Sequence, residues 1–220
     1  MSKFFIAVYT HEVKSYCDVE FFTNILKFTS KDYALHIVDN TEHEGYANKL
    51  KNICDNLCLK VDSITHLNIP PNPHNTNFHR KVRDSVNLLR DKFLESDCEY
   101  FLIIESDVIT PLNVLEKFLD VIDKADLIGA IYYRTIHKDE WFNPEHCELI
   151  STNVFSGCTL YKRNVIEKIA FRIDETDLAS FPDSNMSLDA NRSGFKTALY
   201  TGIKCEHAHS SCGTRNFIRN

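Results

Sequence analysis

Glycine is scarce in this sequence, with 6 residues among 220, where about 7% is usual. Neither G-x-G-x-x-G nor G-x-x-x-x-G-K-[ST] occurs. The glycine-rich loops that hold phosphates in dinucleotide-binding and Walker-type proteins are therefore excluded. If a protein of this sequence binds a phosphate ligand, it has to neutralise the ligand's charge in another way.

Long apolar runs and an excess of basic residues are also missing. The longest apolar runs, Phe4–Tyr9 and Tyr100–Ile104, are too short to cross a bilayer, and the N-terminus makes a poor signal peptide. The net charge of -6 argues against nucleic acid as a partner, because backbone contacts need clustered Lys and Arg. We expect no transmembrane segment, a cytoplasmic location and eight reduced cysteines.

Alternating apolar patterns predict an α/β fold. Apolar runs predict strands at Phe4–Thr10, Tyr33–Asp39, Leu59–Leu67, Tyr100–Ile104 and Leu127–Tyr133, with short ones near Thr159–Tyr161 and Thr197–Tyr200. Helical periodicity predicts helices at Asp18–Phe28, Tyr46–Leu57, Phe78–Phe93 and Leu112–Ile122, and a short helix after Asp183. This alternation favours a single domain, residues 1–220, with a mostly parallel central sheet flanked by helices.

Polar residues follow several of the predicted strands. Thr10, Asp39 and Glu105–Asp107 all stand at carboxyl ends of strands, where open parallel sheets bind ligands. The carboxylates of Glu105 and Asp107 are separated by one residue, and carboxylate oxygens are preferred ligands of Mg²⁺ and Mn²⁺. The segment therefore predicts a metal site, although a solvated turn is the alternative, since Ser and Asp are common in turns.

The residues Tyr100–Pro111, YFLIIESDVITP, resemble the DxD segment of glycosyltransferases with the GT-A fold. The chain is similar to that superfamily over nearly its whole length, and most similar to its family-two-type members. Phe4–Thr10 resembles the first strand and nucleotide loop. Val38–Asn40 resembles the end of the second strand, whose Asp faces the base of the nucleotide. Arg83 stands in the helix where such enzymes often carry an Arg near the nucleotide.

The second half of the chain continues the resemblance. Phe155–Tyr161, with Ser156 and Gly157, resembles the strand near the donor sugar and the acceptor. Phe181–Asp183 followed by Gly194–Lys196 resembles the "ED" box and the turn after its helix. Tyr200–His207 resembles the closing strand, which often ends on a metal-binding His.

Two positions depart from the family's pattern. Glu105 stands where the DxD motif begins with Asp, and Pro182 stands where the ED box has its Glu. Asp183 is then the match for the second position of that box, with Asp189 as a rival. These departures leave open an alternative function, a non-catalytic GT-A-like module that binds a sugar or a partner.

The resemblance implies a metal-dependent glycosyltransferase that moves a sugar from a nucleotide-sugar donor, a UDP-sugar, to the hydroxyl of a glycan, protein or lipid-linked acceptor. A divalent cation would neutralise the leaving diphosphate. Asp107 and His207 would bind it, and an imidazole ligand favours Mn²⁺ over Mg²⁺. Glu105 would hold a ribose hydroxyl or a metal-bound water. Asp183 would be the base, and the reaction would invert the anomeric centre.

The implied binding residues fall into two halves of the chain. Residues 1–107 would bind the nucleotide, through Thr10, Asp39, Arg83, Glu105, Ser106 and Asp107. Residues 108–220 would hold the metal and the acceptor, with Ser156, Gly157, Trp141 and Asp189 near the sugars. Trp141 lies in His137–Cys147, which could be a lid over the acceptor or a packed surface loop.

Each candidate also has a simpler interpretation. Asp183 follows a Pro and suits a helix N-cap. Asp39 could serve a turn, and Arg83 could pair with a neighbouring acid on a helix face. His207 could be an ordinary packed histidine. It also belongs to a C-x-H-x-H-x-x-C cluster, Cys205–Cys212, whose residue types suit zinc although its spacing matches no known finger.

Overall fold

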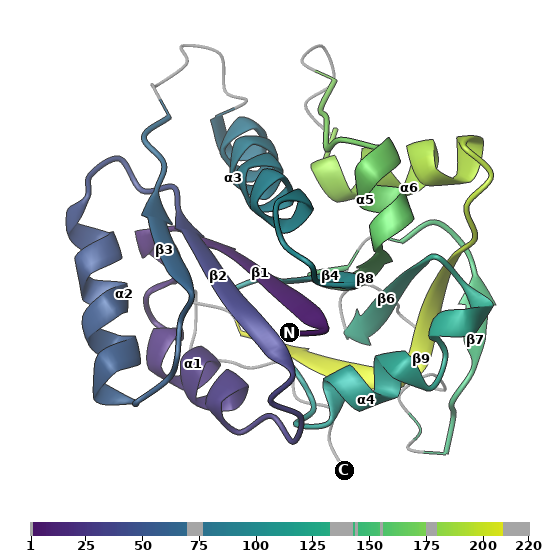
Figure 1. The fold of residues 1–220 in the computed structure, drawn as a ribbon, viewed down its shortest axis with the longest axis horizontal. Helices are drawn as coiled ribbons and strands as arrows, with labels where there is room; N and C mark the ends of the chain where they lie inside the picture. Colours follow the sequence, from purple (N-terminus) through teal and green to yellow (C-terminus); the bar gives the residue numbers. More distant parts are fainter. Residues whose placement is uncertain are drawn as a thin grey trace.

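The computed structural model describes residues 2–69, 77–132, 143, 145–154, 156–174 and 180–208. Figure 1 shows the elements in chain order. They are β1 (Phe4–Thr10), η1 (Glu12–Lys14), α1 (Asp18–Leu26), β2 (Tyr33–Asp39), α2 (Gly45–Asn56), β3 (Ser63–His66), α3 (Asn77–Leu94), β4 (Tyr100–Ile104), β5 (Val108–Ile109), α4 (Val114–Leu119), η2 (Ile122–Lys124), β6 (Leu127–Tyr132), β7 (Leu149–Ser151), β8 (Cys158–Lys162), α5 (Arg163–Lys168), α6 (Pro182–Arg192) and β9 (Thr197–His207).

The strands form a sheet in the order β3-β2-β1-β4-β8-β6-β9-β5, with β7 paired to β9. β1 pairs in parallel with β2 and β4, and β2 pairs in parallel with β3. The predicted parallel sheet is thus found in the first half. In the second half β8 runs antiparallel to both β4 and β6. No helix stands between β6 and β8 among the described residues, and antiparallel neighbours need no crossover helix.

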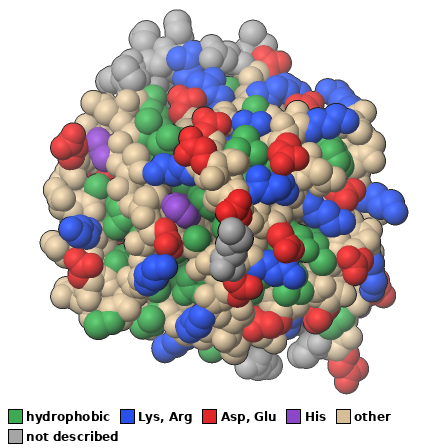
Figure 2. Space-filling view, viewed as in Figure 1, with side chains coloured by type: hydrophobic (Ala, Val, Ile, Leu, Met, Phe, Trp, Pro, Cys, Tyr) green, Lys and Arg blue, Asp and Glu red, His purple; other side chains and the backbone are tan. Residues whose placement is uncertain are grey.

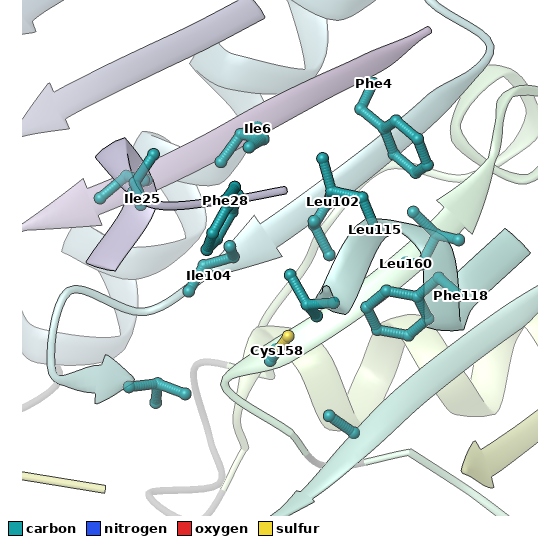
Figure 3. Close-up of a cluster of buried hydrophobic side chains, with 14 of the residues drawn as sticks. Phe4, Ile6, Ile25, Phe28, Leu102, Ile104, Leu115, Phe118, Cys158 and Leu160 are labelled. Atoms are coloured by element: carbon teal, nitrogen blue, oxygen red, sulfur yellow. The ribbon is translucent and has the colours of Figure 1, made fainter. Parts of the chain in front are cut away.

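Helices cover both faces of the sheet, as the strand–helix alternation predicts. In Figure 1, α1, α2 and α4 lie on one face, and α3, α5 and α6 lie on the other. Each face has its own cluster of buried apolar side chains. Figure 3 shows the first cluster, where Ile25 and Phe118 from the helical layer approach Ile6, Leu102 and Leu160 of the strands. All seven residues of β1 are buried, which explains why Phe4–Tyr9 is an apolar run.

β9 is longer than its predicted strand and changes partners along its length. Thr197–Tyr200 pairs in parallel with β6, and the register then shifts so that Lys204 and Cys205 face Ile131 and Tyr132. The end of β9 pairs antiparallel with β5, where His207 lies opposite Val108. The extension therefore carries His207 to the edge where β4 ends.

Short elements account for most of the other differences from the expected pattern. β5, β7, α5 and η1 were not predicted, because two to six residues are too few to show a period. β3 begins at Ser63 rather than Leu59, since Leu59 lies in the turn that closes the C-terminal end of α2. Its N–H donates to the Cys54 carbonyl at 3.0 Å, across Cys58 in the left-handed conformation at φ 53°.

Among the described residues, no helix combines the length and the apolar character that crossing a membrane requires. Acidic and basic side chains are interspersed over the face seen in Figure 2. The segment Pro70–Pro73 and residue Trp141 lie outside the described residues.

Gly129 of β6 provides a test of the packing of this strand against β9 and the segment before β8. A Cβ at this position would meet Cγ1 of Val154 at 2.4 Å and Cδ2 of Leu199 at 3.0 Å. We expect Gly129→Ala to lower the free energy of unfolding by about 1–3 kcal/mol, because the added methyl overpacks this region. Urea denaturation with an unchanged m-value would measure the loss.

Gly45→Ala is the matched control. Gly45 begins α2, and a Cβ there would meet nothing nearer than the His43 ring at 3.4 Å. Its stability should stay the same or rise slightly, since Ala favours helix. Equal losses in the two variants would contradict the packing at Gly129.

Candidate functional site

The turn after β4 is fixed by backbone hydrogen bonds with residues next to two other strands. The Glu105 N–H donates to the Gly157 carbonyl at 2.7 Å, next to β8. The Asp107 carbonyl accepts from the Ala208 N–H at 2.8 Å, just beyond β9. Ser106 is buried between these anchors, and its hydroxyl has no hydrogen-bond partner among the described residues. The two carboxylates therefore project from a backbone held on both sides.

Glu105, Asp107 and His207 form a group that can hold a metal ion. One potential ligand atom from each lies within 4.8 Å of the others. The His207 Nε2 is 3.7 Å from Oδ2 of Asp107, and the His207 ring stacks on Tyr132 with centroids 5.3 Å apart. Two carboxylates and an imidazole fit Mn²⁺, which accepts both oxygen and nitrogen ligands. The structure thus brings together the two predicted metal ligands and adds Glu105 to them.

Lys14, which the sequence analysis did not single out, lies in the same cluster. Its ammonium donates to Oδ1 of Asp107 at 2.7 Å and to Oε2 of Glu105 at 3.4 Å. Burial lowers the pKa of Lys14, but the carboxylates of Glu105 and Asp107 outweigh it and hold this pKa well above its usual value. Lys14 therefore stays charged. The only sequence signal for it was a cationic residue in the segment after the first strand.

Gly157 lets Glu105 reach the cluster. A Cβ on Gly157 would lie 3.0 Å from Cδ of Glu105 and 2.9 Å from Cγ2 of Val108, so a larger residue would push both side chains away. The neighbouring Ser156 is buried, and its hydroxyl donates toward the Ala130 carbonyl at 2.9 Å. In this structure Ser156 fixes the backbone that carries Gly157.

A cleft with a volume of about 220 Å³ lies at the carboxyl ends of β1 and β2. Its lining residues are Tyr9, Thr10, His11, Val13, Lys14, Asn40, Phe78, Lys81 and Val82. Polar groups, two lysines and apolar side chains thus meet in one space. Such a mixture suits a ligand with both an aromatic and an anionic part.

Asp39 does not line this cleft, although its neighbour Asn40 does. It is fully buried, with Oδ1 accepting from the Thr41 N–H at 2.9 Å and Oδ2 lying 3.0 Å from the His66 ring nitrogen. Both carboxylate oxygens are thus engaged, as the turn interpretation expects. Asp39 orders the loop that presents Asn40 to the cleft.

Arg83 lies on α3 next to Val82, a residue that lines the cleft. Its Nε donates to Oδ1 of Asp84 at 2.6 Å, so the pairing with a neighbouring acid that the sequence left open is present. Nucleotide binding by Arg83 stays a prediction.

A second cavity, of about 140 Å³, shares Tyr9, Phe78 and Val82 with the cleft. Its other lining residues are Val86, Ile103, Glu105, Ser156, Tyr161, Phe171, Phe181, Pro182 and Asp183. Because they share these lining residues, the cleft and the second cavity are adjacent. Glu105 lines the second cavity, and Lys14, which binds Glu105, lines the first.

Asp183 places a weakly acidic carboxyl group in the second cavity. Burial and, to a smaller extent, the Glu105 carboxylate together raise the pKa of Asp183 to about 6. Asp183 is not the N-cap of α6, because Phe181 holds that position and makes no side-chain cap. Instead Oδ1 of Asp183 accepts from the Ser184 N–H at 2.8 Å.

Asp189, the rival of Asp183, makes ion pairs farther along α6. Its two carboxylate oxygens accept from Arg172 at 2.6 and 2.9 Å, and Arg192 lies 3.6 Å away. It lines neither of the two cavities described above. A sugar-binding role for Asp189 stays a prediction. Trp141, and His209 and Cys212 of the zinc alternative, lie outside the described residues.

Comparisons with known proteins identify the fold. No protein-family model matches the chain, and no curated protein sequence matches it. Solved structures do match it. The S. aureus TarS 1–349 structure has 14% identity and a TM-score of 0.62 over 92% of this chain and 60% of that one.

Two further structures were determined with ligands. The mannosyltransferase PcManGT from Pyrobaculum calidifontis, in complex with GDP-Man and Mn²⁺, has 13% identity and a TM-score of 0.63 over 96% of this chain and 58% of that one. S. aureus TarS 1–349 in complex with UDP-GlcNAc has 13% identity and a TM-score of 0.63, covering 92% and 58%.

These matches confirm the expected fold class, an α/β domain with the GT-A-like fold. At identities this low, the likeness concerns the fold. The chain spans about 60% of the length of these neighbours or less.

The raised pKa of Asp183 predicts a pH-dependent effect on stability. Below about pH 4 the carboxyl group is neutral in both the folded and the unfolded chain. Between that value and about pH 6, the unfolded chain loses the proton while the folded one keeps it, so wild-type stability falls. Asp183→Asn has no charge to bury. With metal chelated, we expect it to be more stable than wild type by about 1–3 kcal/mol at neutral pH and equal near pH 4.

Urea denaturation at several pH values measures this difference. Asp189→Asn is the control. Its effect on stability should have the opposite sign, because Arg172 lowers the pKa of Asp189. A stability difference for Asp183→Asn that does not change between pH 4 and 7 would contradict the burial of its carboxyl group.

Proposed function

We propose that this protein is a metal-dependent glycosyltransferase that transfers a sugar from a nucleotide-sugar donor, a UDP-sugar, to an acceptor hydroxyl. The observation that carries the proposal is the position of the cluster of Glu105, Asp107 and His207. It connects to the cleft through Lys14 and to the second cavity through Glu105. A cation site beside one space for a nucleotide and one for an acceptor is what this reaction requires.

The cleft supports a nucleotide donor. Thr10 and Asn40 offer polar groups, Val13 and Phe78 offer apolar surface for a base, and Lys14 offers positive charge for phosphates. Structures of the same fold support this choice, since PcManGT was determined with GDP-Man and Mn²⁺ and TarS with UDP-GlcNAc and UDP. In our proposal residues 1–107 bind the nucleotide and residues 108–220 complete the metal and acceptor sites.

Asp107, His207 and Glu105 would hold Mn²⁺ or Mg²⁺. When bound, the cation supplies positive charge for the diphosphate that leaves as the glycosidic bond breaks. The protein's own residues keep this arrangement rigid, since the turn of Glu105–Asp107 is anchored to residues beside β8 and β9. A rigid charged site lowers the reorganisation needed in the transition state.

Asp183 would accept the proton of the attacking acceptor hydroxyl. Its pKa of about 6 leaves it ionised at neutral pH yet more basic than an ordinary Asp, which suits a general base. The aromatic side chains of Tyr161, Phe171 and Phe181 line the same cavity and offer a surface for an acceptor. Direct attack on the anomeric carbon, with the base on the acceptor side, gives inversion. The acceptor would be a glycan, a protein or a lipid-linked molecule.

Asp107→Ala should abolish Mn²⁺-dependent UDP binding, because it removes a ligand that lies between His207 and Glu105. Isothermal titration calorimetry of UDP with and without Mn²⁺ measures this. Asp126→Ala is the matched control, because it also removes an Asp paired with a Lys, Lys162 at 3.1 Å, away from the cluster. It should bind UDP like the wild type. Absence of metal-dependent UDP binding by the wild type itself would refute the proposed function.

Asp183→Asn should bind UDP normally and lose transfer by about 100-fold or more, because general-base catalysis contributes factors of this size. Wild-type transfer should rise with pH to a plateau above about pH 6, as Asp183 ionises. A panel of UDP- and GDP-sugars with candidate acceptors, followed by product analysis, measures both.

The same panel separates the alternatives. Loss of transfer in Asp189→Asn, with full transfer in Asp183→Asn, would assign the base to Asp189. Binding of nucleotide sugars with neither transfer nor hydrolysis by the wild type would favour the non-catalytic binding module.

A further inference from the structure

Lys14 occupies a position that the proposed metal also needs. Its ammonium lies 2.7 Å from Oδ1 of Asp107 and 3.4 Å from Oε2 of Glu105, and only 17% of its side chain is exposed. The same two carboxylates and His207 form the group that can hold a metal ion. A divalent cation bound to all three would lie next to the Lys14 ammonium, and the two cations would repel each other.

The backbone of Lys14 is fixed while its side chain is long. Lys14 ends η1, where the His11 Nδ1 accepts from the Val13 N–H at 3.2 Å and the Lys14 N–H donates to the His11 carbonyl at 2.8 Å. The Lys14 carbonyl accepts from the Cys17 N–H at 3.2 Å. Lys14 would therefore change its ion-pair partner by rotating its own four-carbon side chain, while the backbone of η1 stays in place.

The cleft gives the ammonium a second place to lie. Lys14 lines the cleft together with Thr10, Asn40 and Lys81. Lys81 is already paired, since its ammonium contacts Glu42 and lies 3.2 Å from the His11 Nε2. Once Asp107 releases it, the Lys14 ammonium can therefore pair with a diphosphate that enters this cleft.

We propose that Lys14 is an exchangeable internal cation, which neutralises Glu105 and Asp107 before ligands bind, yields Asp107 to the divalent cation, and then pairs with the diphosphate of the nucleotide. This inference rests on the proposed function for the identity of the nucleotide. It gives Lys14 opposite effects on the two ligands: it competes with the metal and assists the diphosphate.

The test measures the two effects separately by calorimetry. Lys14→Met keeps the length of the side chain and removes its charge. Its affinity for Mn²⁺ alone should rise by about tenfold or more, because the competing charge is gone. Its affinity for UDP at saturating Mn²⁺ should fall by about tenfold or more, because a charge-assisted contact is lost. A residue that merely holds the fold would weaken both.

Lys81→Met is the matched control, because Lys81 lines the same cleft but pairs with Glu42 and His11 instead of the cluster. Its affinity for Mn²⁺ alone should stay within about threefold of wild type, since screening weakens distant charges. Lys14→Gln, which keeps hydrogen-bond donors without charge, should behave like Lys14→Met and serves if that variant does not fold.

Each remaining outcome is decisive. Unchanged or weaker Mn²⁺ binding in both Lys14 variants overturns the exchange, and unchanged UDP binding overturns the pairing with the diphosphate. Tighter Mn²⁺ binding in the Lys14 variants, with no turnover of any nucleotide sugar by the wild type, would support the exchange and refute the glycosyltransferase. Sugar transfer by the wild type, with neither change in affinity in the Lys14 variants, would support the glycosyltransferase and refute the exchange.

Discussion

The repulsion between two carboxylates is the constraint on which this site depends. Glu105 and Asp107 leave the end of β4 with one residue between them, and the Asp107 side chain is only 8% exposed. Two such charges at about 4 Å repel each other by about 4 kcal/mol at a protein surface. A positive charge must therefore stand close to them. The fold supplies that charge with Lys14, from the segment after β1.

The sheet provides the rigidity that such a cluster needs. β1 and β4 are central, buried and parallel, so the turn after β4 begins from a fixed point. Gly157 beside β8 leaves room for the Glu105 side chain, and β5 pairs with the end of β9. The second half of the sheet is mixed, and its last strand, β9, pairs with β6 and then with β5. A strand that stayed beside β6 would not bring a histidine to Asp107.

The sequence predicted the fold best where strands are buried on both faces. Phe4–Thr10, Tyr33–Asp39 and Tyr100–Ile104 have the bounds expected from their apolar runs, whereas Val108–Ile109 is too short to show a pattern. In the site, resemblance to a known fold suggested Asp107 and His207 as neighbours, and the structure brings them together. Lys14 could not be found in this way, because a contact with a residue 93 positions away leaves no local signal. No sequence pattern could show that His66 and Thr41 engage both oxygens of Asp39, and its contact with the nucleotide stays a prediction.

The change of partners along β9 links the cation site to the local dynamics of the fold. His207 and the Ala208 N–H that holds Asp107 both stand at the end of one strand, whose other end is packed in the sheet. Fraying of the short β5–β9 pairing would move His207, a proposed metal ligand, and loosen the turn in a single event. A ligand that binds only the closed form suppresses such opening by mass action. The rate at which the β9 amide protons exchange with solvent would then report on the occupancy of the site.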